Sequence, residues 1–253
     1  MLPVLALGGC RDGAVRVAFD PEVGAEYVYR VRVAAELVTR IADRPVRRTT
    51  DENVFTARHK VLASGPDGSR VRVRLETEGQ EARTFEVRLD RAGQLAEVQR
   101  IEGIPADVLG GLGLSEIFPA AAGALPERPL APGDRWTIDE AVTTGDGGGR
   151  IAGTGRLTRL GVVDGRRRAT VESDYLLPVA RTTSEGDRPL RLEGDQRTRA
   201  TSSYDLRDGA VEKVEAETTG RFRLVVLPPS GGTGPGIPGR LDLRLHSETR
   251  RLR

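Results

Sequence analysis

Cysteine and histidine are almost absent from the 253 residues, which hold one cysteine, Cys10, and two histidines, His59 and His246. A lone cysteine excludes an internal disulfide, and this inventory offers no closely spaced His/Cys set for zinc. A hydrolytic triad needs a histidine beside a nucleophile. Both histidines instead stand in alternating, charged sequence, so we expect them on strand surfaces. We predict no enzyme activity, no metal site and no cofactor.

Lysine is equally scarce: of the 39 lysine and arginine residues, only Lys60 and Lys213 are lysines. The arginines that make up the rest are interspersed with 37 Asp and Glu, and the net charge is only +2. This pattern indicates a mixed, solvated surface, so we expect no nucleic-acid partner. The carboxylates alternate with arginines, as in Arg88–Arg91, which is typical of cross-strand pairs and not of a glycosidase acid pair.

Long apolar runs are also missing. No stretch approaches the roughly 18 apolar residues that a membrane-spanning helix needs, and we expect a soluble body. Aromatic residues make up only 4% of the chain. Apolar and charged residues nevertheless alternate regularly, which indicates a folded protein.

Period-2 alternation is the dominant pattern. It places apolar side chains on one face of each predicted strand and polar ones on the other, which predicts a mainly β protein with an antiparallel sheet. Pro66-Asp67-Gly68, Asp164-Gly165 and Asp208-Gly209 are turn signals between the runs. The clearest alternating runs are Val15–Phe19, Tyr27–Val33, Val71–Leu75, Phe85–Leu89 and Leu241–Leu245.

The order of these features repeats, so we predict two similar β-meander halves, 14–103 and 131–253. In each half a glycine precedes the first strand, an Asp-Gly turn follows, and a hairpin closes the half. The turn residues common to all-β proteins could produce the same weak similarity without duplication. The connector, 104–130, begins with an apolar stretch from Ile104 to Leu125. Pro105 suits a first helical position, whereas the glycines weaken a helix, so we expect one or two short helices there.

Two Gly-rich segments have the composition of surface loops, Gly145–Gly149 and 228–239. Arg150 follows the first of them where a phosphate-binding loop would have Gly-Lys-Ser/Thr, so this segment predicts no nucleotide site, and Gly111-Leu112-Gly113 lacks the third glycine of a dinucleotide fingerprint.

The amino terminus reads Met1-Leu2-Pro3-Val4-Leu5-Ala6-Leu7-Gly8-Gly9-Cys10. An apolar run ending in small residues before cysteine resembles the lipobox of bacterial lipoproteins. We therefore predict lipidation of Cys10, with 1–13 as signal remnant and anchor. Only nine residues precede Cys10 and no positive charge opens the run, so we expect the true start to lie upstream. The alternative is a short apolar terminus with an incidental thiol.

Two further motifs accompany the lipobox: the Pro-Gly-Asp-x-Trp strand start within Leu125–Trp136, and the Tyr-Asp-x-x-x-Gly-x-Val hairpin of Tyr204–Val211. With them the chain resembles uncharacterised bacterial envelope lipoproteins, over most of residues 20–226. The resemblance implies a curved, half-barrel-like antiparallel sheet. It also implies attachment to the cell envelope, and the absence of Asp directly after Cys10 favours the outer membrane.

Two functions remain open at this point. In the first, the concave sheet binds a hydrophobic ligand beneath the apolar connector; in the second, the protein is a structural or interaction lipoprotein whose arginine-rich strand faces bind envelope proteins. The aromatic candidates could equally fill the core of each half. The predicted groove residues are Tyr27, Tyr29, Trp136, Leu112, Ile117 and Phe118.

Overall fold

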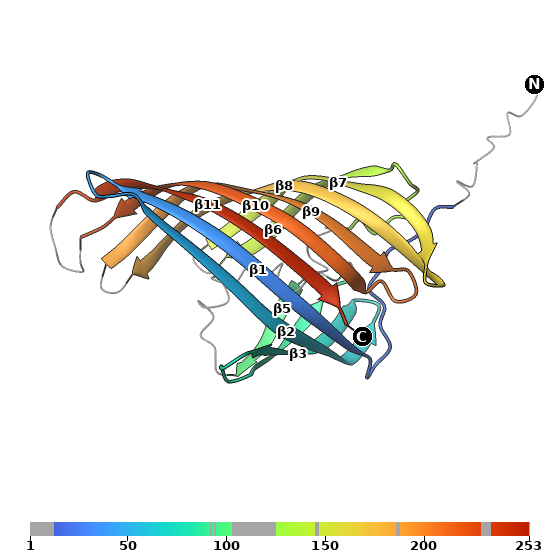
Figure 1. The fold of residues 1–253 in the computed structure, drawn as a ribbon. Helices are drawn as coiled ribbons and strands as arrows, with labels where there is room; N and C mark the ends of the chain where they lie inside the picture. Colours follow the sequence, from blue (N-terminus) through green and yellow to red (C-terminus); the bar gives the residue numbers. More distant parts are fainter. Residues whose placement is uncertain are drawn as a thin grey trace, which may run out of the picture.

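The computed structural model describes residues 13–91, 93, 95–102, 125–144, 147–185, 188–228 and 234–252. Over these residues eleven strands form one antiparallel sheet, and none of the described residues forms a helix that could cross a membrane. The predicted mainly β, curved antiparallel fold is confirmed (Figure 1). The strands are β1 (Glu26–Ile41), β2 (Arg47–Gly65), β3 (Gly68–Thr77), β4 (Arg83–Leu89), β5 (Leu95–Glu102), β6 (Arg135–Thr144), β7 (Gly147–Val163), β8 (Arg166–Glu185), β9 (Arg188–Asp205), β10 (Val211–Val226) and β11 (Ile237–Arg251).

The first and last strands pair in the middle of the sheet. The strand order is β5-β4-β3-β2-β1-β11-β10-β9-β8-β7-β6, so β5 and β6 form its two edges. The predicted halves thus become the two wings of one sheet, and their duplication stays a prediction. The chain passes from one edge to the other between Glu102 and Arg135. The short helices predicted in 104–125 lie outside the described residues, apart from Leu125 itself.

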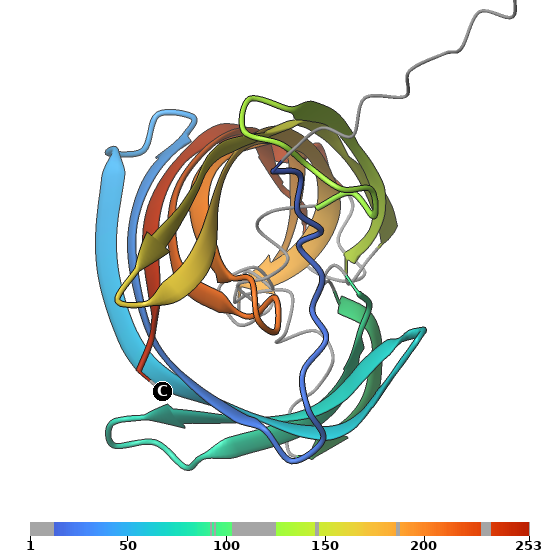
Figure 2. The same ribbon diagram turned by 90° about the vertical axis from the view of Figure 1, so that its right-hand side faces the viewer.

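Alternation along each strand separates two faces. In β10, Val214, Ala216 and Thr218 are buried, whereas Glu215 and Glu217 are exposed. Figure 2 looks along the sheet and shows the strands curving around a common interior. We call the face that contains the buried residues the inner face, and the charged one the outer face.

The segment 13–25, which we call the strap, crosses one end of the curved sheet (dark blue in Figure 2). Val15 exchanges two backbone hydrogen bonds of 2.8 Å with Leu130, and the Phe19 and Asp20 amides donate to the carbonyls of Arg91 and Asp208. Val17 and Phe19 are buried in the core. The alternation over Val15–Phe19 therefore predicts burial correctly, but the segment is not a strand of the sheet: Val15 forms an isolated β-bridge with Leu130, and Ala25 accepts a hydrogen bond from the Val61 amide of β2.

Glycines on the inner face permit close packing at strongly curved places. Gly155 is the cross-strand partner of Trp136, whose indole lies where a Cβ of residue 155 would be. Gly194 is likewise the partner of Phe222, and a Cβ there would meet the backbone of Arg221 and Phe222. The Trp136 ring therefore covers the backbone of Gly155, and the Phe222 ring covers that of Gly220 in its own strand.

Parts of both predicted loops are strand. Gly147–Gly149 pair with Val142–Thr144, and β11 begins at Ile237, so the loop interpretation of these residues is wrong. Gly239 explains part of the second case, because it pairs with Ile41 so closely that a Cβ would meet the Arg40 carbonyl. Glycine at this position allows the two strands to approach closely and does not indicate a flexible loop.

The outer face carries cross-strand pairs of arginine and carboxylate. The Arg32 guanidinium donates to both carboxylate oxygens of Glu52, at 2.9 and 3.0 Å, and this hydrogen bonding lowers the pKa of Glu52. Arg197 binds Asp174 in the same two-pronged way. Such exposed pairs add little stability each, but they neutralise the arginine-rich surface locally.

Candidate functional site

The inner face divides into two halves along the strands. The strap half lies next to the strap and holds the main hydrophobic cluster, in which Val31, Ala57, Val73, Leu157 and Tyr204 have no exposed surface. The far half lies towards the opposite end. There a second, smaller cluster contains Leu192, Phe222 and Leu224.

Three of the predicted groove residues lie in the strap half. Tyr27, Tyr29 and Trp136 are 3%, 3% and 8% exposed and belong to the main cluster. Their burial favours the core interpretation. The other three, Leu112, Ile117 and Phe118, lie outside the described residues, as does Cys10.

Tyr27 ties several elements together at the strap end. Its hydroxyl donates to Asp208 Oδ2 at 3.0 Å, and the Arg251 guanidinium lies 4.7 Å from its ring centroid. Burial and then the Asp208 carboxylate raise the pKa of Tyr27. Because Asp208 also accepts the Asp20 amide through its carbonyl, the group joins β1, β11, the β9–β10 turn and the strap.

The histidine expectation is half right. His246 is exposed on the outer face, but His59 is only 5% exposed and packs edge-on against Tyr29 at 5.1 Å. The reason is register: His59 is the cross-strand partner of Tyr27 and so shares its inner face. In the described residues no group of three or more His, Cys, Asp and Glu is placed to hold a metal ion.

The far half of the inner face carries apolar side chains that are only half-buried. They come from four strands, β1, β8, β9 and β11, and we call this surface the apolar strip. Its half-buried members are Ala35, Leu37, Ile41, Leu177, Val179, Leu190, Leu241, Leu243 and Leu245. The inward residues of β10, between β9 and β11, include Phe222 and Leu224, which are buried.

The apolar strip is also uncharged over its central strands. The inward positions of β1 from Val33 to Ile41 are Val, Ala, Leu, Thr and Ile, and the matching positions of β11, β10 and β9 likewise carry no charged residue. The outward positions of the same strands carry Arg32, Arg244 and Glu217. A half-buried apolar surface of this extent on a concave face is typical of a ligand-binding surface.

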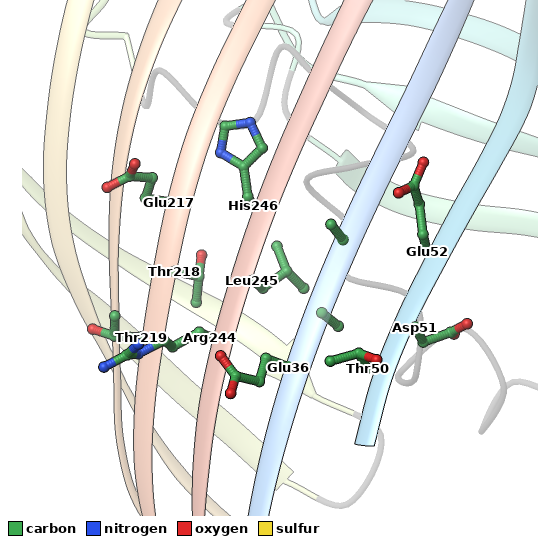
Figure 3. Close-up of a pocket in the computed structure, with 12 residues that line it drawn as sticks. Glu36, Thr50, Asp51, Glu52, Glu217, Thr218, Thr219, Arg244, Leu245 and His246 are labelled. Atoms are coloured by element: carbon green, nitrogen blue, oxygen red, sulfur yellow. The ribbon is translucent and has the colours of Figure 1, made fainter. Parts of the chain in front are cut away.

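The outer face has two shallow hollows of a different character. One, of about 740 Å³, is lined by Glu36, Glu52, Glu217, Arg244 and His246 among others. Figure 3 shows these side chains spread over neighbouring strands. Two of its carboxylates are already paired, Glu36 with Arg48 and Glu52 with Arg32. A second hollow of about 550 Å³ adjoins it through Glu217 and His246.

The sequence contains a signal for the apolar strip. Leu241, Leu243 and Leu245 alternate in the same way as the core residues, and so do Ala35 and Leu37. Alternation identifies which face these residues occupy, but it does not tell whether another part of the chain covers them. That information comes only from strand pairing and curvature.

Comparison with known proteins finds no matching protein family and no matching curated protein. Among solved structures, the chain is similar to DynF from the dynemicin biosynthesis pathway of Micromonospora chersina, at 9% identity. The match covers 97% of this chain and 92% of that one, with a TM-score of 0.22. So low a score supports no argument about function.

Proposed function

We propose that the protein is an envelope lipoprotein, anchored through a lipid on Cys10, whose curved sheet binds a hydrophobic ligand on the apolar strip. The observation that carries the ligand proposal is the contrast within one face. The strap half is filled by its own core, whereas the far half leaves aliphatic side chains half-buried, with no charged residue at the inward positions of β1, β11, β10 and β9. Charged residues begin on the flanking strand β2, where Asp51 and Arg47 lie opposite Ala35 and Thr39.

The dimensions of the apolar strip favour a long aliphatic ligand. The nine residues from Val33 to Ile41 span about 25 Å along the strand, and the five adjacent strands from β1 to β8 span about 20 Å across the sheet. Leucine, isoleucine and valine supply most of the surface, so burial of alkyl groups is the main source of binding energy. The inward positions of the central strands carry no charged residue that would pair with an ionic group in the middle of the ligand.

The connector is the part of the chain best suited to cover this ligand. It joins the two edge strands, β5 and β6, and its sequence from Ile104 to Leu125 is apolar. We assign Leu112, Ile117 and Phe118 to the cover. Its carboxyl-terminal part is fixed, because Leu125 and Leu130 are both buried in the main cluster.

Binding of proteins to the outer face is the alternative. Its motivation is the abundance of arginine, but Arg32, Arg72 and Arg197 each bind a carboxylate on a neighbouring strand. Those pairs leave less unbalanced charge for a partner, so the geometry favours the inner face.

Two adjacent leucines of β8 provide a matched test of the ligand site. Leu177 points inward and is half-buried, whereas Leu176 points outward and is 47% exposed. In the full chain carrying Cys10→Ala, Leu177→Gln should weaken binding of the fluorescent apolar probe N-phenylnaphthylamine about tenfold, because a lost leucine contact is worth roughly 1.4 kcal/mol. Leu176→Gln should leave the affinity unchanged.

Equal effects of the two substitutions, or no probe binding to the parent protein, would contradict the ligand proposal. The anchor is tested separately by incorporation of radiolabelled palmitate into the full-length gene product. Label should appear in the parent and be lost in Cys10→Ala; absence of label from both proteins removes the anchor.

A further inference from the structure

Exposed apolar side chains gather at the strap end of the sheet. Val162 and Val163, in the β7–β8 hairpin, are 66% and 38% exposed. Val23 in the strap is 65% exposed, and Leu252, which follows β11, is 54% exposed. None of the four belongs to the main hydrophobic cluster or packs against it, so their exposure is not a consequence of core packing.

Hydrogen bonds place these residues at one end of the molecule. Val163 pairs with Arg166 across the hairpin, and the Arg167 carbonyl accepts the amide of Leu206 in the β9–β10 turn. The Leu252 amide donates to the Val28 carbonyl near the start of β1, and Gly24, next to Val23, bonds to Val61. Figure 2 looks directly onto this end.

The β7–β8 hairpin also carries unbalanced positive charge. Arg159, Arg166 and Arg167 are exposed, and the only acidic residue from 159 to 168 is Asp164, which lies 3.7 Å from Arg168. Outside the hairpin, the buried Asp205 lies 3.9 Å from Arg166, and Glu212 pairs with Arg168. An exposed apolar tip flanked by arginines is the pattern that binds anionic bilayer surfaces, where valines enter the interface and guanidinium groups contact phosphates.

The proposed lipid-bearing residue, Cys10, is close in sequence to the strap and therefore to the strap end of the sheet. The strap begins at Gly13, and only two residues separate Gly13 from Cys10. Three peptide units can extend over about 11 Å at most. A lipid on Cys10 would therefore hold the strap end within about 11 Å of the bilayer surface, without a linker that lets the body move away.

We propose that the strap end lies against an anionic phospholipid surface, with Val162 and Val163 at the interface and Arg166 and Arg167 at the phosphates. This inference rests on the proposed lipid anchor at Cys10. In this orientation the apolar strip and the loop 42–46 lie on the side of the molecule remote from the anchoring membrane. The ligand is then exchanged on the side remote from that membrane, and not drawn from beneath the body.

Hydrogen–deuterium exchange on the unmodified full chain tests this orientation, because its single cysteine allows tethering at Cys10 without any cellular lipidation. The protein is coupled to vesicles of roughly equal parts phosphatidylcholine and phosphatidylglycerol containing a trace of maleimide-headgroup lipid. Tethering gives a high effective concentration, so amide exchange in 162–167 should slow about fivefold relative to protein blocked with N-ethylmaleimide in buffer. Exchange in 42–46, at the opposite end, should be unchanged.

Two exposed valines give the matched controls. Val162→Asp should abolish the protection of 162–167 on vesicles, whereas Val46→Asp, at a residue 60% exposed in the far loop, should leave it intact. Unchanged exchange of 162–167 on tethering would overturn the proposal, and so would protection of 42–46 or protection that survives Val162→Asp. Because coupling is chemical, these outcomes do not depend on whether palmitate is incorporated in the cell.

Discussion

Replacing Gly209 with alanine should lower the free energy of unfolding by about 4 kcal/mol or more, the largest effect expected of any single methyl group here. Gly209 has φ of +67°, and a Cβ there would lie 2.7 Å from the Phe19 amide nitrogen and closer still to the Ala18 carbonyl. Both contacts are with backbone atoms, which cannot rotate away as a side chain can, so the strap would have to move off the end of the sheet. Val17 and Phe19 would then lose their burial, at about 1.5–3 kcal/mol each.

Gly165 is the matched control for this substitution. It has a similar φ of +74°, but no atom lies within 4 Å of the place that a Cβ of residue 165 would occupy. Gly165→Ala should therefore cost only the left-handed backbone penalty, about 1–2 kcal/mol in chemical denaturation. Trypsin cleavage after Arg16, an exposed strap residue, should accelerate only in Gly209→Ala. Equal losses in the two variants would show that the strap contributes nothing.

Gly155→Ala should destabilise the protein by about 3 kcal/mol, because its methyl group would overlap the buried indole of Trp136 and force it to move. Gly65→Ala, in open space at the end of β2, should change stability by less than about 0.5 kcal/mol. Thermal or urea unfolding measures both.

The double variant Gly155→Ala/Trp136→Leu distinguishes overlap from a general intolerance of side chains at residue 155. Trp136→Leu alone costs burial, but it removes the ring atoms that the new methyl group meets. The double variant should therefore be more stable than the sum of the single changes by about 1–2 kcal/mol. Strict additivity would contradict the packing of Trp136 over Gly155.

The sequence predicts the strand content well because alternation and turn chemistry are local. The Asp164-Gly165 turn is an example: both residues have positive φ, as the two-residue hairpin requires. The same locality limits what a sequence can predict. Alternation does not specify partners, so the pairing of β1 with β11 could not be predicted. The inward side of His59 was a missed signal, because His59 alternates in step with Phe55, Ala57 and Val61, which are all buried.

The candidate site was harder to predict than the fold. Tyr27, Tyr29 and Trp136 attract attention because large rings are rare in this chain, yet all three lie in the core. The apolar strip consists of ordinary leucines, and only curvature and strand order separate Leu243 from a core residue. One signal was present for Trp136: Gly155 within an alternating strand indicates close approach by another group, as Gly153 does for Tyr175.

The most direct test of the central claim is where an apolar molecule sits on the sheet. A long-chain fatty acid carrying an aliphatic diazirine can be photolysed with the full chain and the labelled residues identified by mass spectrometry. We expect labels on inward residues of the far half, such as Leu37, Leu177 and Leu243, and none on Leu176. Labels confined to the outer face, or to the exposed hairpin at Val162 and Val163, would contradict a ligand site on the apolar strip.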